Sequence, residues 1–189
     1  MKIAFVIYND VTLLDFAGAF DPLTRLKTMG FVPDLGWDIC ARTPVVRSAE
    51  GAELVPARVG NDLSPYDYVI IPGGDGIKEL MRDPAFLRWI SVASEKTTVA
   101  AVCGGALLIG AAGLLRERRA TTHPALLPVL KNFAREVSTD RIVDEGYIIT
   151  AGGVTSAIDL GLYLCEKIGG KDVREKIQRQ MDYRQYSPI

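Results

Sequence analysis

Short apolar runs that alternate with helical segments are the feature that most restricts the fold of this chain. Each run is continuous, rich in β-branched residues and followed by a polar or glycine-rich loop. The runs cover residues 2–7, 68–71, 97–102 and 147–150. Runs of this kind are typical of strands buried on both faces of a parallel sheet. Because helical segments follow these strands, the sequence predicts an α/β fold with helices on both faces of the sheet.

The segments between these runs predict the remaining elements. Residues 37–41 are expected to form a second strand, and residues 45–46 and 53–55 a small antiparallel hairpin around residues 48–51. Pro22 and Pro84 each suit the first turn of a helix, and Asp83 suits the N-cap of the second one. The predicted helices are residues 22–29, 84–95, 106–112, 154–168 and 173–181.

Length and charge limit the possible classes of protein. A chain of 189 residues predicts a single domain, residues 1–189. The net charge of −1 and a short basic cluster interrupted by Glu117 predict no binding to nucleic acid or to an anionic membrane. The N-terminus lacks a signal-peptide pattern, and apolar stretches such as residues 106–115 are shorter than the ~20 residues of a membrane span.

The cysteine pattern predicts a reducing cytoplasm and no metal. Cys40, Cys103 and Cys165 are odd in number and widely spaced, which argues against a disulfide framework and a zinc site. Cys40 lies within a predicted strand and Cys165 on the apolar face of a predicted helix, so both are expected in the core. Cys103 differs, because it lies between a buried strand and a helix.

A ligand crevice is expected beyond the carboxyl ends of the parallel strands. Five loops should meet there, namely those after Ile7, Ile71, Val102, Thr122 and Thr150. The residues that these loops carry are Asp15, Gly73, Gly74, Cys103, His123, Gly152 and Gly153.

Cys103 is the residue in this crevice best suited to covalent chemistry. A helix N-terminus lowers the pKa of a nearby thiol, and a thiolate is a strong nucleophile. Gly104 and Gly105 allow the tight turn that a nucleophile elbow needs. The alternative is a buried structural thiol, which is the usual state of a free cysteine.

Asp15 and His123 are candidate partners of Cys103. If Asp15 faces the sulfur, two adjacent anions repel, so one group should hold a proton that Asp15 can later deliver. Asp15 could instead cap the following helix. His123, the only histidine, could serve as a base for Cys103 or could simply begin a helix before Pro124.

The glycines Gly73, Gly74 and Gly104 could offer backbone N–H groups to a developing oxyanion. Such glycines are equally compatible with simple turns, and no glycine pattern typical of phosphate binding is present. The residues alone therefore leave these functions open.

Four segments resemble the ThiJ/PfpI superfamily, the DJ-one proteins. They are YVIIPGGDG (68–76), VAAVCGGALLIGAAGL (99–114), ATTHP (120–124) and TAGGVTSAIDLG (150–161). The segment LLDFAG at 13–18 resembles the isonitrile hydratase branch most closely. The resemblance implies a flavodoxin-like parallel sheet between helices, as in class I glutamine amidotransferases, and association into a homodimer.

The resemblance also implies functions for individual residues. Cys103 would be the nucleophile, Asp15 the acid bonded to it, and His123 the histidine near the cysteine, with no cofactor and no metal. Gly73, Gly74 and Gly104 would shape the pocket. One position departs from the branch: isonitrile hydratases usually have threonine and glycine after the cysteine, whereas this chain has Gly104 and Gly105. A hydroxyl that would orient the ligand is therefore missing.

These observations support two hypotheses of different kinds. The first is a cysteine-dependent enzyme acting on a small electrophilic substrate, either by isonitrile hydration or by a glyoxalase or deglycase reaction on small dicarbonyls. The second is a redox-sensing stress-response protein in which Cys103 is oxidised and nothing is turned over. An apolar pocket floor is expected from Leu14, Phe16 and the helix after Cys103.

Overall fold

A mostly parallel sheet forms the centre of the molecule. The computed structural model describes residues 1–184, and residues 185–189 of the predicted domain lie outside the described residues. Within residues 1–184 the sheet has seven strands in the order β10-β11-β7-β6-β1-β2-β5. The strands are β1 (Lys2–Val6), β2 (Gly36–Ala41), β5 (Arg58–Val59), β6 (Tyr68–Ile71), β7 (Thr98–Val102), β10 (Ile142–Asp144) and β11 (Ile148–Ala151).

Neighbouring strands of this sheet are parallel except for the β10–β11 pair. The predicted α/β fold is confirmed, and each of the buried runs forms a strand. The predicted hairpin is also present as β3 (Val46–Arg47) and β4 (Glu53–Leu54). The short strands β5, β10 and β9 (Glu136–Val137) carry no strong sequence pattern and were not predicted. Strand β9 pairs with β8 (Arg119–Ala120), which overlaps the short strand predicted at residues 120–122.

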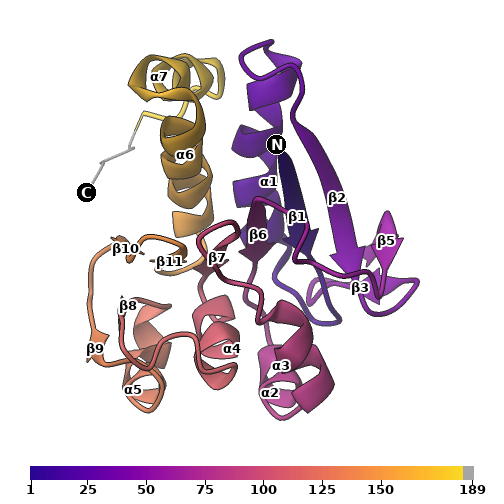
Figure 1. Ribbon diagram of the computed structural model, residues 1–189, viewed down its shortest axis with the longest axis vertical. Helices are drawn as coiled ribbons and strands as arrows, with labels where there is room; N and C mark the ends of the chain where they lie inside the picture. The colour runs from indigo at the N-terminus through magenta and orange to yellow at the C-terminus, as the bar shows by residue number, and fades with distance from the viewer. Residues whose placement is uncertain (185–189) are drawn as a thin grey trace.

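Two groups of helices flank the sheet. The helices are α1 (Leu13–Thr28), α2 (Ile77–Leu80), α3 (Pro84–Ile90), α4 (Gly105–Ala111), α5 (Leu127–Leu130), α6 (Ser156–Gly169) and α7 (Lys171–Gln180). Figure 1 shows α1, α6 and α7 together at the top and α2 to α5 together at the bottom. Among residues 1–184, no helix has both the length and the apolar character that a membrane span requires.

The helix predicted to start at Pro22 begins nine residues earlier, at Leu13. Pro22 therefore lies inside α1, where a proline removes one backbone hydrogen bond. Close packing against α6 accompanies this irregular position, since a Cβ atom added to Gly161 would lie 2.4 Å from the Pro22 ring. Local preference placed the helix start at the proline, whereas contact with α6 stabilises a helix that continues through it.

The other helix predicted from a proline is confirmed at its start. Asp83 caps α3 by accepting hydrogen bonds from the N–H groups of Ala85 (2.8 Å) and Phe86 (3.1 Å). The helix ends at Ile90, five residues before the predicted end. Cys40 and Cys165 are fully buried, as expected for core residues.

Candidate active site

Cys103 occupies a strained turn between β7 and α4. Its φ angle is +54°, which is uncommon for a residue other than glycine. Neighbouring loops hold this conformation: the Cys103 N–H donates to the Gly152 carbonyl (2.8 Å), and the Thr122 hydroxyl donates to the Cys103 carbonyl (2.6 Å). Strain of this kind is found at functional sites that the surrounding structure stabilises. The expected nucleophile-elbow geometry is therefore present.

Asp15 faces Cys103 and does not cap its helix. It is the third residue of α1, and the N-cap is Thr12, whose side chain makes no capping bond. The Asp15 side chain is fully buried, and its Oδ2 atom accepts a hydrogen bond from the Gly73 N–H (3.0 Å). Asp15 Oδ2 and Cys103 Cβ lie side by side, since a Cβ atom added to Gly73 would be 2.8 Å from the first and 3.0 Å from the second. The capping alternative is thus excluded.

Burial raises the pKa of both groups in this pair. The pKa of Asp15 rises to about 7, mainly by burial and further by the nearby charge of Glu50, although hydrogen bonds from Gly73 and Cys103 oppose the rise. The pKa of Cys103 rises to about 12, again mainly by burial and then by the charge of Asp15, and the Gly104 N–H opposes it. Two adjacent anions in a buried site repel, so the pair holds one proton between these pH values.

This result differs from the sequence-based expectation of a thiol with a lowered pKa. The helix after Cys103 is short, and the stabilisation of a thiolate by its first N–H groups is opposed by burial of the sulfur. Cys103 is only 8% exposed. Desolvation favours the neutral thiol. The thiolate form of Cys103 therefore depends on a proton being held by Asp15.

Of the three candidate glycines, Gly73 and Gly104 lie next to this pair, whereas Gly74 packs against the loop after β1. The Gly73 N–H bonds Asp15, and a Cβ atom at Gly73 would lie 2.6 Å from the Gly104 nitrogen. The Gly104 N–H lowers the pKa of the Cys103 thiol. Gly74 has a φ of +128°, and a Cβ atom there would lie 2.2 Å from the Asp10 carbonyl oxygen. These close approaches require glycine.

We expect Gly74→Ala to lower the free energy of unfolding by about 3 kcal/mol, because it combines an unfavourable φ with a backbone overlap. Gly30→Ala is the matched control, since Gly30 has a φ of +78° and nothing within 4 Å of the added Cβ atom. It should cost about 1 kcal/mol. Urea titrations of both variants measure the difference, and equal losses would mean that the close approach to Asp10 is not important.

His123 lies in the same crevice but has a different immediate partner. Its Nδ1 atom accepts a hydrogen bond from the Ala125 N–H (3.2 Å) at the start of a short 3-10 helix, Pro124–Leu126. The groups that shift the pKa of Cys103 are Asp15 and the Gly104 N–H, and His123 is not among them. His123 therefore caps a helix while its ring borders the crevice.

The predicted crevice is a cleft of about 780 Å³. Each of the five loops contributes to its lining, through Thr12, Gly74, Cys103, His123 and Val154. Further apolar walls come from Ile77, Met81, Leu107, Leu126, Val129 and Phe133. A cleft of this composition suits a ligand with an apolar group.

The expectation that Leu14 and Phe16 form the pocket floor is wrong. The Leu14 side chain is 43% exposed, and the Phe16 ring is packed in the core against Phe5, with centroids 6.3 Å apart. Both residues lie in the first turns of α1, where only Asp15 is turned towards Cys103. The expectation for the helix after Cys103 is confirmed by Leu107.

Gly104, where isonitrile hydratases usually have threonine, is covered by a side chain from α2. A Cβ atom at this position would lie 2.6 Å from Cδ1 of Ile77. Ile77 thus fills the space that the missing side chain would use. A hydroxyl at this turn that the sequence did not single out is that of Thr122, which donates to the Cys103 carbonyl; Thr122 is 2% exposed. Its position within ATTHP was the available signal.

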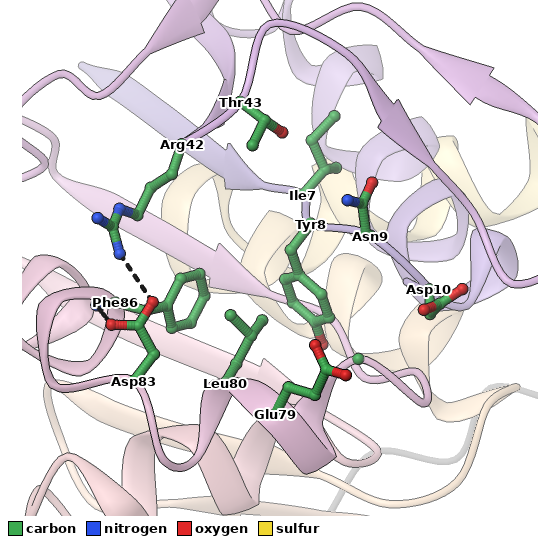
Figure 2. Close-up of a pocket in the computed structure, with 11 residues that line it drawn as sticks. Ile7, Tyr8, Asn9, Asp10, Arg42, Thr43, Glu79, Leu80, Asp83 and Phe86 are labelled. Atoms are coloured by element: carbon green, nitrogen blue, oxygen red, sulfur yellow. Dashed lines mark hydrogen bonds and ion pairs between the residues drawn. The ribbon is translucent and has the colours of Figure 1, made fainter.

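A second cavity, of about 300 Å³, is lined in part by Tyr8 and is shown in Figure 2. Arg42 and Asp83 form an ion pair at its edge (3.0 Å), and the rings of Tyr8 and Phe86 line it. The Tyr8 hydroxyl donates a hydrogen bond to the Pro72 carbonyl (2.6 Å). In residues 1–184, no cluster of three or more His, Cys, Asp or Glu side chains is arranged to hold a metal ion.

Comparison with known proteins supplies a family for this fold and site. The chain is 35% identical over 191 residues to isonitrile hydratase of Pseudomonas putida, covering 100% of this chain and 81% of that protein. It is 26% identical over 133 residues to glutathione-independent glyoxalase DJR-1.2 of Caenorhabditis elegans, and this match covers 69% of this chain and 71% of that protein.

A solved structure has the same fold over the whole chain. The crystal structure of a ThiJ/PfpI family protein from Pseudomonas syringae superposes with a TM-score of 0.84 at 27% identity, covering 100% of this chain and 77% of that one. The model of the DJ-1/PfpI family matches residues 1–167. On this evidence, the chain belongs to the DJ-1/PfpI family.

Proposed function

We propose that the protein is a cysteine-dependent enzyme that adds water to an isocyanide and releases an N-substituted formamide. The observation that carries this proposal is the buried Asp15–Cys103 pair, which holds one proton at the base of an apolar cleft. Isonitrile hydration needs a nucleophile and a proton at one carbon atom, and the pair supplies both. The identity to isonitrile hydratase of Pseudomonas putida supports the same reaction.

The proposed reaction starts when the Cys103 thiol passes its proton to Asp15 and the sulfur attacks the terminal isocyanide carbon. A C–S bond forms, and the proton held by Asp15 is transferred to this carbon, giving a thioimidate. Water then adds across the C=N bond, so that its oxygen bonds the carbon and one of its protons goes to the nitrogen. The C–S bond breaks as the C=O bond forms, and the second water proton returns to the pair. The isocyanide and one water molecule thus become one formamide, and the enzyme is regenerated without a cofactor.

The cleft composition favours an isocyanide with an apolar substituent. Ile77, Leu107 and Phe133 can contact such a group while the isocyanide carbon lies at Cys103. Burial also excludes bulk water from the pair, which strengthens the interaction of its charge with the reacting carbon.

A glyoxalase reaction is the second candidate. The position of His123 in the same cleft as Cys103 and the similarity to a glyoxalase of Caenorhabditis elegans favour it. In that reaction Cys103 would form a hemithioacetal, and Asp15 or His123 would move the proton. A redox sensor has less support, because a buried thiol with a raised pKa reacts slowly with oxidants.

Steady-state assays on cyclohexyl isocyanide and on methylglyoxal distinguish these candidates. We expect formamide production from the isocyanide and little turnover of methylglyoxal. Turnover of methylglyoxal alone would favour the glyoxalase, and turnover of neither compound would reject the enzymatic proposal. Intact-mass measurement after peroxide treatment tests the sensor, for which rapid addition of two oxygen atoms at Cys103 is required.

A further inference from the structure

Tyr8 is a buried side chain that the proposed reaction does not use. It is the second residue after β1, is 5% exposed, and its ring makes an edge contact with Phe86 at a centroid distance of 5.8 Å. Figure 2 shows this ring at the wall of the second cavity. The hydroxyl donates a short hydrogen bond of 2.6 Å to the Pro72 carbonyl. A buried phenol with one well-defined acceptor has a fixed position.

The acceptor of this bond belongs to the peptide group that holds Asp15. The carbonyl of Pro72 and the N–H of Gly73 are the two ends of one peptide unit, and the N–H donates to Asp15 Oδ2 (3.0 Å). Because a peptide unit is planar, rotation that frees one end also moves the other. A hydrogen bond accepted at the carbonyl also polarises the N–H and strengthens its donation.

We propose that Tyr8 is a positioning residue whose hydroxyl fixes the plane of the Pro72–Gly73 peptide, so that its N–H stays on Asp15 and Asp15 stays on Cys103. This inference deepens the proposed function and rests on the role of the pair in it. Gly73 has no side chain that could restrain this peptide plane, so hydrogen bonds and backbone packing must do so. On the opposite side, a Cβ atom at Gly105 would lie 2.7 Å from the Pro72 carbonyl oxygen, so the backbone packs closely there.

The charges around the pair give the direction of the effect. The titratable groups that face Asp15 are Cys103 in the turn after β7, Tyr8 after β1 and Glu50 in the β3–β4 loop. Burial and the charges of Asp15 and Cys103 raise the pKa of Tyr8, so its hydroxyl remains a neutral donor. The Gly73 N–H lowers the pKa of Asp15, so weakening this bond should raise that pKa further.

Tyr8→Phe tests the proposal, with Tyr66→Phe as the matched control. Tyr66 is also buried, at 4% exposure, but its hydroxyl donates to Asp38 (2.7 Å). The readout is the rate of Cys103 alkylation by iodoacetamide between pH 5 and 9, followed by peptide mass. For Tyr8→Phe we expect the apparent pKa of the profile to rise by about half a pH unit, so that alkylation on the plateau above pH 8 is about threefold faster, because the Cys103 thiolate requires the shared proton to be on Asp15. The Tyr66→Phe profile should match the wild type.

A third variant separates positioning from a general loss of packing. Phe86→Leu removes the ring contact with Tyr8 but leaves the hydroxyl bond available, so it should lower the melting temperature without shifting the alkylation profile. A Tyr8→Phe profile that coincides with the wild type would overturn the proposal, and so would an equal shift in Phe86→Leu. Alkylation does not require turnover. Absence of isocyanide hydration by the wild type would therefore reject the proposed function without deciding the role of Tyr8.

Discussion

Replacement of Cys103 by serine is expected to lower isocyanide hydration at least about 10³-fold, to a level near the background. The serine hydroxyl has a far higher pKa than a thiol, and Asp15, with a pKa of about 7, is too weak a base to ionise it in a buried site. The variant should keep its fold, because the change preserves shape in a turn held by the backbone. Formamide formation, followed with the far-ultraviolet spectrum, measures both effects.

Cys40→Ser is the matched control for this experiment. Cys40 is a fully buried thiol in β2, away from the cleft, so the same chemical change should leave turnover nearly intact. Any loss there should be one of stability, since a hydroxyl is more costly to bury than a thiol. Wild-type turnover in Cys103→Ser would contradict covalent catalysis by the sulfur, and equal losses in both variants would indicate a general effect of serine.

Asp15→Asn is expected to stabilise the protein at pH 8 while it impairs the reaction. The folded state raises the pKa of Asp15 from 3.8 to about 7, so ionisation of this buried carboxyl opposes folding at high pH. The full shift corresponds to about 4 kcal/mol, and the uncharged amide avoids this cost. Turnover should fall because an amide cannot deliver the proton to the isocyanide carbon.

The raised pKa of Asp15 also determines how the free energy of unfolding changes with pH. The folded protein keeps the Asp15 proton up to pH of about 7, whereas the unfolded chain releases it near pH 4, so stability decreases as pH rises across this window. Asp15→Asn should remove this decrease, and urea titrations at pH 5 and pH 8 measure it. Asp159→Asn serves as a contrast: Asp159 is buried but paired with Arg141, so its loss should destabilise. An Asp15→Asn variant less stable than the wild type at pH 8 would contradict the raised pKa.

Local patterns predicted most of the sheet but not its edges. The buried strands could be identified because each is a continuous apolar run ended by a loop, as at residues 97–102. The edge strands β5 and β10 are two and three residues long and carry no such pattern. The start of α1 was missed because Pro22 is locally a helix-start signal, and its contact with Gly161 comes from a distant part of the chain. The homodimer stays a prediction.

The candidate site was predictable in its members but not in its electrostatics. Chain order was sufficient to bring Cys103 and His123 to one cleft, with Asp15 buried beside Cys103, because the carboxyl ends of parallel strands lie at one edge of a sheet. The direction of the Cys103 pKa shift required the folded structure, since burial depends on atoms from segments far apart in the chain. The same holds for the hydroxyl of Tyr8 on the Pro72 carbonyl, 64 residues away, which no local pattern encodes.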